Sequence, residues 1–213
     1  MTAPAPFAEI WRGPFLESVH SGHAVICDST GQIIDAWGDP ERVVLARSSS
    51  KMIQALPLVR SGAADAFSLS TKQLALSCAS HQGAKIHVDN VGAWISQLGL
   101  DDTAFRCGPE ESRERDVKEA QIRAHESPCR IHNNCSGKHA GFLTLSRHLG
   151  GDANYVAPDH PVQRACLEAF EDVTQETSPG FGIDGCSAPN YAATLHGIAR
   201  AMAHFAAAPE GSA

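Results

Sequence analysis

The sequence predicts an α+β fold in which strands come first and helices dominate the rest. Short β-branched and aromatic runs, separated by glycine, proline and aspartate, occupy residues 7–46. From residue 51 onward, apolar residues recur every three or four positions in segments that end at glycine. The 213 residues are 43% hydrophobic and 19% charged, which is enough to bury a core, so we expect one folded domain over residues 1–213.

The strands are predicted from apolar runs next to turn residues. Residues 7–20 form a strand region that a Gly-Pro pair interrupts. Residues 24–27 and 33–37 flank the turn sequence 28–31, which predicts a β-hairpin. Residues 43–46 form a third strand, and this strand leads directly into the first helix.

The helices are predicted from apolar spacing and from their capping residues. Ser70 and Gln73 have the spacing of a capping box, and Pro161 suits the first position of a helix. The expected helices end at Gly62, before Gly83, at Gly99, near His125, at Gly150, after Val173 and near Ala207, and the last of them begins at about Ala192.

Charge and composition exclude several classes of protein. The formal net charge is -7 and no basic block occurs, which argues against nucleic-acid binding. No apolar stretch is long enough to span a membrane, and the N-terminus lacks the pattern of a signal peptide, so we expect a cytoplasmic protein. Seven cysteines without a C-x-x-C motif indicate reduced thiols, with a metal or reactive site as an option.

Ser48 and Lys51 form the first candidate catalytic pair. They stand at the junction of the third strand and the first helix, and residues three apart share a helix face. A serine becomes a nucleophile when a base takes its proton, and burial near a helix N-terminus lowers the pKa of a lysine toward that role. The same pattern is also typical of a serine that caps a helix, with an exposed lysine in the first turn. By pattern alone, this structural interpretation is favoured.

Cys135, Lys138 and Cys186 form a second candidate group. Cys135 precedes a predicted helix, whose dipole is expected to lower its pKa, and Lys138 lies three residues further along. Cys186 belongs to a second loop rich in small residues. Two thiolates on rigid loops can hold a metal, with zinc the default, although two ordinary buried cysteines are the commoner explanation of such spacing.

Three polar residues near these groups have two interpretations each. Ser80 is either a helix-capping hydroxyl or a second serine that relays protons, and His139 is either a structural or a catalytic histidine. Arg47 is either a surface charge or a ligand for a substrate carboxylate.

The sequence from Gly180 to Gly185 matches a dinucleotide-binding fingerprint, but no strand precedes it and Pro189 interrupts any following helix, so we reject that function.

Four blocks occur in a diagnostic order along the chain. They are Arg47-Ser48-x-x-Lys51, Ser77-Cys78-Ala79-Ser80-His81, Asn133-Asn134-Cys135-Ser136-Gly137-Lys138-His139-Ala140-Gly141 and Gly182-Ile183-Asp184-Gly185-Cys186-Ser187-Ala188-Pro189. With them the chain resembles the L-asparaginase II family, the Rhizobium-type or class 3 asparaginases, over residues 9–205. The family is similar in fold to the serine β-lactamases and penicillin-binding proteins, which also carry S-x-x-K at a helix start.

The resemblance implies a role for each matching residue. It implies that Ser48 is the nucleophile, Lys51 its general base and Ser80 a second catalytic serine. It implies zinc as cofactor, held by Cys135, Lys138 and Cys186, and it implies that Arg47, His139 and Asp184 contact the substrate. The implied partner is a small molecule, L-asparagine, and the implied assembly is a homodimer.

One departure from the family leads to alternative hypotheses. Family members continue beyond the position of Ala213 and carry a further catalytic lysine and further sheet strands there, whereas the tail from Ala206 has no lysine. We therefore expect a C-terminally truncated chain with an incomplete sheet. The sequence then favours hydrolysis of asparagine to aspartate and ammonia. The alternatives are an inactive remnant that binds zinc and a Ser-Lys hydrolase for another amide, such as a β-lactam or peptide.

Overall fold

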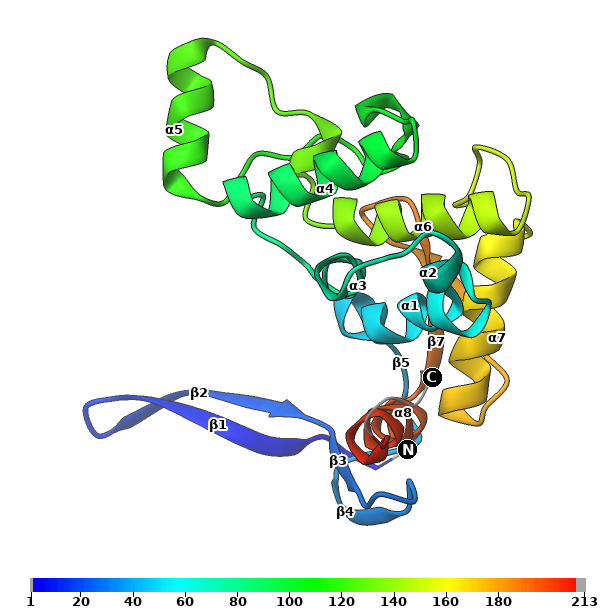
Figure 1. Cartoon of the computed structure of the whole chain (residues 1–213). Coiled ribbons are helices and arrows are strands. Elements are labelled where there is room, and N and C mark those ends of the chain that lie inside the picture. Colours follow the sequence, from blue (N-terminus) through cyan, green and yellow to red (C-terminus); the bar gives the residue numbers. More distant parts are fainter. Residues whose placement is uncertain (1, 210–213) are drawn as a thin grey trace. The chain divides into compact units, whose positions relative to one another are not determined.

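The computed structural model describes residues 2–209 and contains both helices and strands, which confirms the α+β class (Figure 1). The β-lactamase-like arrangement and the incomplete sheet stay predictions. The described chain divides into two compact units, each treated by itself below. The first unit contains the residues up to Ala46, residues 171–180 and the residues from Tyr191 onward, and the second contains residues 47–170 and 181–190. The expectation of one domain stays a prediction.

The first unit begins with two antiparallel hairpins. β1 (Ala5–Arg12) pairs with β2 (Phe15–Gly22) around the predicted Gly-Pro interruption. β3 (Ala24–Cys27) pairs with β4 (Ile33–Trp37), which confirms the hairpin expected from the sequence. Its turn is closed by a hydrogen bond of 2.9 Å from the Asp28 amide to the Gln32 carbonyl.

The end of the first unit corrects one prediction. Residues 189–194, expected to be a loop and the start of a helix, form strand β7 (Pro189–Thr194), and its last three residues pair with β5 (Val43–Leu45). Pairing with β5 overrides the helix propensity of the alanines. Thr194 then caps α8 (Leu195–Ala207) by accepting a 2.9 Å hydrogen bond from the Gly197 amide, and α8 packs against β3.

The second unit is mainly helical. Three of its helices end next to the predicted glycines, because Gly62, Gly99 and Gly150 all have positive φ. The capping box of Ser70 and Gln73 is present, but the helix that it starts ends at Ser77, ahead of Gly83. Its elements are η1 (Arg47–Ser50), α1 (Lys51–Arg60), α2 (Ala63–Ala66), α3 (Thr71–Ser77), α4 (Lys85–Gln97), η2 (Asp102–Ala104), α5 (Arg115–Ala124), η3 (Arg130–His132), α6 (Ser136–His148), the first part of α7 (Pro161–Thr174) and β6 (Phe181–Ile183).

Helix α6 is the centre of the second unit, where α1, α3 and α4 pack around it (Figure 1). Every residue from Ser136 to Ser146 is buried. Two glycines let the neighbouring helices approach closely. A Cβ at Gly137 would overlap the carbonyl oxygen of Leu76 in α3, and a Cβ at Gly141 would lie 3.0 Å from Leu58 in α1. This close packing brings the start of α6 next to α1 and the end of α3.

Among residues 2–209, no helix combines the length and the hydropathy that crossing a membrane requires.

Candidate active site

Ser48 and Lys51 lie at the start of α1 but face different surroundings. Ser48 belongs to the 3-10 turn η1 and is exposed. Lys51 is the first residue of α1, and only 2% of it is exposed. The sequence predicts a direct contact between the Ser48 hydroxyl and the Lys51 amine. In the structure Ser48 is exposed to solvent, whereas Lys51 is buried.

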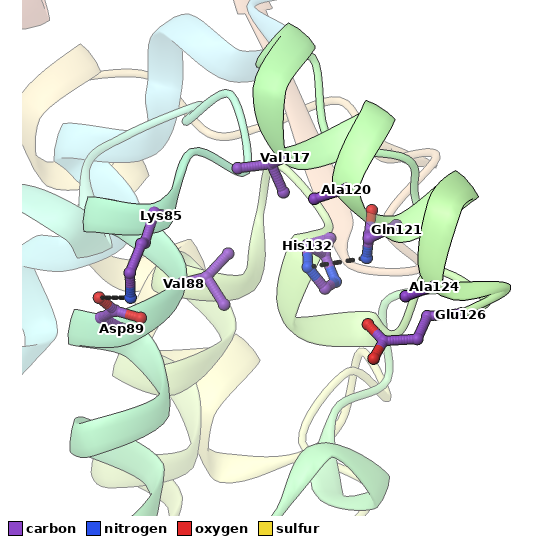
Figure 2. Close-up of a pocket in the computed structure, with 9 residues that line it drawn as sticks. All are labelled: Lys85, Val88, Asp89, Val117, Ala120, Gln121, Ala124, Glu126 and His132. Carbon is purple, nitrogen blue, oxygen red and sulfur yellow. Dashed lines mark hydrogen bonds and ion pairs between the residues drawn. The ribbon is translucent and has the colours of Figure 1, made fainter.

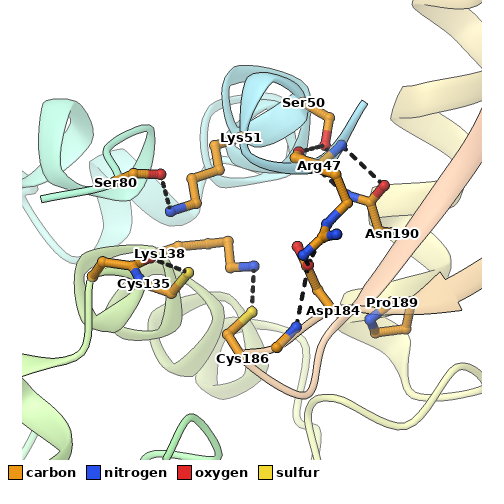
Figure 3. A network of polar contacts seen from close by, with 12 residues as sticks. Arg47, Ser50, Lys51, Ser80, Cys135, Lys138, Asp184, Cys186, Pro189 and Asn190 are labelled. Carbon is orange, nitrogen blue, oxygen red and sulfur yellow. Dashed lines mark hydrogen bonds and ion pairs between the residues drawn. The ribbon is translucent and has the colours of Figure 1, made fainter. Parts of the chain in front are cut away.

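The amine of Lys51 reaches the segment that follows α3. Its Nζ donates hydrogen bonds of 2.8 Å to the Ala79 carbonyl and 2.8 Å to Ser80 Oγ (Figure 3). Burial lowers the pKa of Lys51, as expected for a lysine that acts as a base, while the neighbouring Cys135 opposes this effect. The structure thus brings Lys51 and Ser80 together, and Ser80 is a direct partner of the amine.

The three predicted zinc ligands form one buried cluster. Cys135 is the N-cap residue of α6 and Lys138 lies one turn later, while Cys186 comes from the loop after β6. Lys138 Nζ donates a hydrogen bond of 3.0 Å to Cys186 Sγ. The exposed fractions of the three residues are 6%, 2% and 4%. The amines of both lysines and the two sulfurs point into the same space (Figure 3).

The negative charge of this cluster resides on Cys186. Its pKa is lowered far below that of a free thiol by the hydrogen bond from Cys135, with further contributions from His139 and Lys138 that outweigh burial. The pKa of Cys135 is raised instead, by the same hydrogen bond and by burial. The expected lowering at Cys135 is therefore wrong, because its thiol shares a proton with a better-placed sulfur and also contacts Asn134 Oδ1 at 3.0 Å.

Arg47 and Asp184 meet at the mouth of the site. Arg47 Nε donates to Asp184 Oδ1 at 2.6 Å, and a second guanidinium nitrogen is 2.6 Å from the same oxygen. The Arg47 side chain is 63% exposed and that of Asp184 only 11%. Asp184 lies in the turn after β6, which a 2.9 Å hydrogen bond from its amide to the Ala188 carbonyl closes. A cation and a carboxylate that sequence analysis treated separately are thus one ion pair.

Asn190 was missed by the sequence analysis. Its Oδ1 accepts the Arg47 amide at 3.2 Å and its Nδ2 donates to the Arg47 carbonyl at 3.2 Å. Arg47 has a φ of 52°, which is uncommon for a residue other than glycine. The two hydrogen bonds hold this conformation, so Asn190 fixes the turn that presents Ser48. A lone asparagine after proline carries no sequence signal for such a role.

Glu110 and Asn134 were also missed. Glu110 Oε2 accepts hydrogen bonds from the Asn134 amide at 3.0 Å and from Asn134 Nδ2 at 2.8 Å. Burial acts to raise the pKa of Glu110, but the hydrogen bonds from Asn134 and the contact with Arg113 lower it overall. Glu110 lies in a charged stretch outside the four blocks that carry the family resemblance, which is why no pattern identified it.

These residues line a cavity of about 270 Å³. Its walls are polar and carry a hydroxyl, an ion pair and two thiols, which is a suitable set for a small charged substrate. The lining residues are Arg47, Ser48, Glu110, Asn133, Asn134, Cys135, Asp184, Gly185 and Cys186. Lys51, Ser80 and Lys138 are not among them; the two lysines are buried and Ser80 is exposed.

His139 lies behind the two thiols and does not line the cavity. It is fully buried, and its Nδ1 is 2.8 Å from the Tyr155 hydroxyl. Burial lowers the pKa of His139 to about 4, and a hydrogen bond with Cys186 acts in the opposite direction. The substrate contact that the resemblance implies for His139 stays a prediction.

Metal-binding potential in the site depends on the lysine. No group of three or more His, Cys, Asp or Glu side chains able to hold a metal ion occurs within residues 2–209. The cluster contains two such side chains, the thiols of Cys135 and Cys186, and its third potential metal donor is the Lys138 amine. Zinc binding therefore stays a prediction.

A second cavity, of about 390 Å³, lies between α4, α5 and η3 (Figure 2). Its apolar wall includes Val88, Val117 and Ala120. Its polar residues include His132, whose Nε2 lies 3.1 Å from Gln121 Nε2. Its lining contains no serine, threonine or cysteine. The polar cavity at Ser48 is therefore the better candidate for catalysis.

Comparison with known proteins gives one family match. The model of the L-asparaginase II family matches residues 8–213, which is nearly the whole chain. A search of curated proteins found no match. The matched region contains both halves of the polar cavity, including Ser48 and Cys186. The chain belongs to the L-asparaginase II family.

Proposed function

We propose that the protein hydrolyses the side-chain amide of L-asparagine to aspartate and ammonia. Membership of the L-asparaginase II family supports asparagine hydrolysis in general. The observation that carries the proposal is the polar cavity of about 270 Å³, where an exposed serine hydroxyl stands beside an arginine–aspartate pair and two thiols. Such a cavity suits a small polar amide better than a long or apolar one.

The ion pair of Arg47 and Asp184 supports an amino-acid substrate. Free asparagine carries an α-carboxylate and an α-ammonium, and the pair presents one group of each opposite charge at the cavity. In this proposal, Arg47 binds the carboxylate and Asp184 binds the ammonium. The side-chain amide then extends toward Ser48.

The reaction proceeds by nucleophilic attack of Ser48. Ser48 Oγ adds to the amide carbon, and its proton passes through Ser80 to Lys51. The same proton then returns to the amide nitrogen as the C–N bond breaks, so that the nitrogen leaves as ammonia and an ester to Ser48 remains. Water then cleaves the ester, which yields aspartate and restores the Ser48 hydroxyl. The contact of 2.8 Å between Lys51 Nζ and Ser80 Oγ supports this route for the proton.

The cluster of Cys135, Lys138 and Cys186 fits a zinc ion. Two sulfurs and an amine converge there in a buried space, and a 3.0 Å contact already joins the amine to one sulfur. These three residues would hold the ion, the amine after loss of its proton. When bound, zinc supplies a positive charge that polarises or orients the substrate.

The first experiment measures ammonia release from asparagine by wild type, Ser48→Ala and Ser80→Ala. Ser96→Ala is a matched control, because Ser96 is an exposed serine on α4. We expect Ser48→Ala to abolish turnover, Ser80→Ala to lower it about 100-fold or more, and Ser96→Ala to leave it unchanged. Turnover that survives in Ser48→Ala and disappears in Ser80→Ala would transfer the nucleophile to Ser80.

The same preparations separate the alternatives. Stoichiometric zinc without turnover would identify a non-catalytic metal-binding chain. Acylation of Ser48 by a fluorescent penicillin, seen by mass spectrometry, would indicate another amide as substrate. Light scattering tests the proposed homodimer, and fractionation of cells tests the proposed cytoplasmic location.

The zinc proposal is tested by metal content. We expect Cys135→Ala and Cys186→Ala to lower the zinc that copurifies with the protein. Cys166→Ala is the control, because Cys166 is equally buried but contacts the Gln54 carbonyl instead of the cluster. Equal zinc in all three variants would refute the site.

A further inference from the structure

The β1–β2 hairpin exposes nearly its whole length to solvent. Every residue of its two strands is exposed except Ala5 and Gly22, which pair with each other at its base and are half-buried. The two strands lie side by side as one two-stranded sheet (Figure 1). Such a sheet is marginally stable in water by itself, because stable sheets bury one face against a further strand, a helix or another protein.

Large apolar side chains occupy both faces of the β1–β2 hairpin. Residues that pair across an antiparallel ladder share a face, so Trp11 lies with Leu16, and strand alternation places Ile10 and Phe15 on the opposite face. On the first face, Trp11 Nε1 donates a 2.9 Å hydrogen bond to the Glu9 carboxylate. Covering the apolar residues of this hairpin therefore requires contact with both of its faces.

The apolar area of the hairpin is close to what a dimer interface needs. Six large apolar residues are exposed by 46% or more, and the largest values are 74% at Phe15 and 55% at Trp11. Together they expose roughly 600 Å², given that a whole aromatic side chain offers about 150–250 Å². A standard interface buries about 800 Å² on each partner, of which a little over half is apolar. The six residues are Phe7, Ile10, Trp11, Phe15, Leu16 and Val19.

The charges on the hairpin favour a second copy over a lipid bilayer. The chain has a formal net charge of -7, which opposes association of two copies in general. On the hairpin, however, Arg12 Nη2 lies 2.8 Å from Glu17 Oε1, so these two charges neutralise each other. The same charged groups and the Glu9 carboxylate make insertion into hydrocarbon costly.

We propose that the β1–β2 hairpin is the docking surface for a second copy of this chain. The hairpins of the two copies pack against each other about a two-fold axis, so the same six apolar residues contribute from each side. A partner that is itself a narrow hairpin reaches both faces, which a flat surface does not. The proposal assigns a surface to the homodimer proposed above and does not depend on asparagine hydrolysis.

Sedimentation equilibrium of the full chain over a range of protein concentrations measures the dissociation constant of the dimer. We expect wild type to dimerise and Trp11→Glu to weaken the dimer at least about 100-fold, because a two-fold contact places two new carboxylates in an apolar core. Ile122→Glu is the matched control, since Ile122 is an exposed apolar residue on α5, and it should keep the wild-type constant. A monomeric wild type, or a dimer that Trp11→Glu leaves intact, overturns the proposal.

A second measurement uses wild type alone. Hydroxyl radicals oxidise exposed aromatic side chains, so labelling above and below the dissociation constant identifies the side chains that the dimer covers. We expect Trp11 and Phe15 to be labelled several-fold less in the dimer, and Phe181, an exposed aromatic residue of β6, to be labelled equally in both states. Equal labelling of Trp11 and Phe15 in monomer and dimer places the contact elsewhere and overturns the proposal.

Co-sedimentation with vesicles of phosphatidylethanolamine and phosphatidylglycerol tests a lipid surface as the alternative occupant. We expect wild type to stay in the supernatant. A chain that is monomeric in solution and pellets with vesicles unless Trp11 is replaced would assign the hairpin to lipid and overturn the proposal. None of these readouts depends on turnover, so a failure of asparagine hydrolysis and a failure of this proposal give different results.

Discussion

The amine of Lys51 donates a 2.8 Å hydrogen bond to the hydroxyl of Ser80, across 29 residues of sequence. This contact joins the first residue of α1 to the segment that leaves α3. Ser48 stands on the other side of the same turn, exposed at the cavity. The amine is therefore buried, whereas Ser48 and Ser80 are both exposed residues.

Replacing Lys51 tests this arrangement. We expect Lys51→Met to lower kcat for asparagine more than 100-fold, because the amine that receives the proton is lost. The free energy of unfolding should change little, since an apolar chain of similar volume replaces a buried charge. Lys72→Met, at an exposed position on α3, should keep both quantities. Urea unfolding and ammonia release provide the measurements, and a wild-type kcat in Lys51→Met would contradict the assignment.

Asp184→Asn separates binding from chemistry. The variant keeps the shape of the side chain and removes the charge proposed to hold the substrate ammonium. We expect KM for asparagine to rise about tenfold or more with a smaller change in kcat. Stability should change by less than about 1 kcal/mol, because the partner Arg47 is largely exposed. Steady-state kinetics decide this, and a fall in kcat with constant KM would assign Asp184 to the chemical step.

Gly137→Ala probes the close contact of α6 with α3. The added methyl group would overlap the Leu76 carbonyl oxygen, which belongs to backbone and cannot rotate away. We expect a loss of about 1–3 kcal/mol in the free energy of unfolding, in spite of the better helix propensity of alanine. Gly108→Ala is the matched control, because a Cβ there meets no atom within 4 Å. Urea titrations of the three proteins test this, and equal midpoints for Gly137→Ala and wild type would refute the contact.

His81 predicts how stability depends on pH. Burial, and then the positive charges of His87 and Lys51, lower the pKa of His81 to about 4. In the unfolded chain His81 binds a proton at its usual pKa of about 6.5, whereas in the folded protein it stays neutral down to about pH 4. The stabilisation from neutral His81 is therefore fully present above about pH 6.5 and is lost as pH falls toward 4. At pH 4 this effect of His81 lowers the free energy of unfolding by about 3 kcal/mol relative to neutral pH.

The comparison that isolates this effect is with His81→Gln. Glutamine can still donate to Ser136 Oγ, which His81 Nε2 contacts at 2.8 Å, but it does not titrate. Unfolding measured in urea between pH 7 and pH 4 should show a steeper loss for wild type than for the variant. Parallel curves would mean that His81 has an ordinary pKa in the folded protein.

Local structure was predictable from local signals. The hairpin of residues 24–37 followed from apolar runs around a turn, and α3 followed from its capping box. Strand β7 was not predictable in this way, because Ala192 and Ala193 favour a helix until β5 pairs with them. Its partner lies about 150 residues earlier in the sequence, and no local pattern reports such a contact.

In the candidate site, too, some features were predictable from the sequence and others were not. The residue types at Ser48, Lys51, Cys135 and Cys186 were identifiable from spacing and from the family resemblance. Their orientation was not, because three-residue spacing does not say which side of the turn is buried. The partnership of Arg47 with Asp184, and of His139 with Tyr155, exists only after the chain has folded.

The two hydrogen bonds between Asn190 and the backbone of Arg47 have a consequence for the order in which the site assembles. They connect positions 143 residues apart, so this clamp closes only after Asn190 has been synthesised. Contacts of such long sequence separation form late in folding. Helices α1, α3 and α6 can pack beforehand, whereas the turn that presents Ser48 is fixed last. A nascent chain is thus kept from having this turn in place until the segment that contains Asn190 arrives.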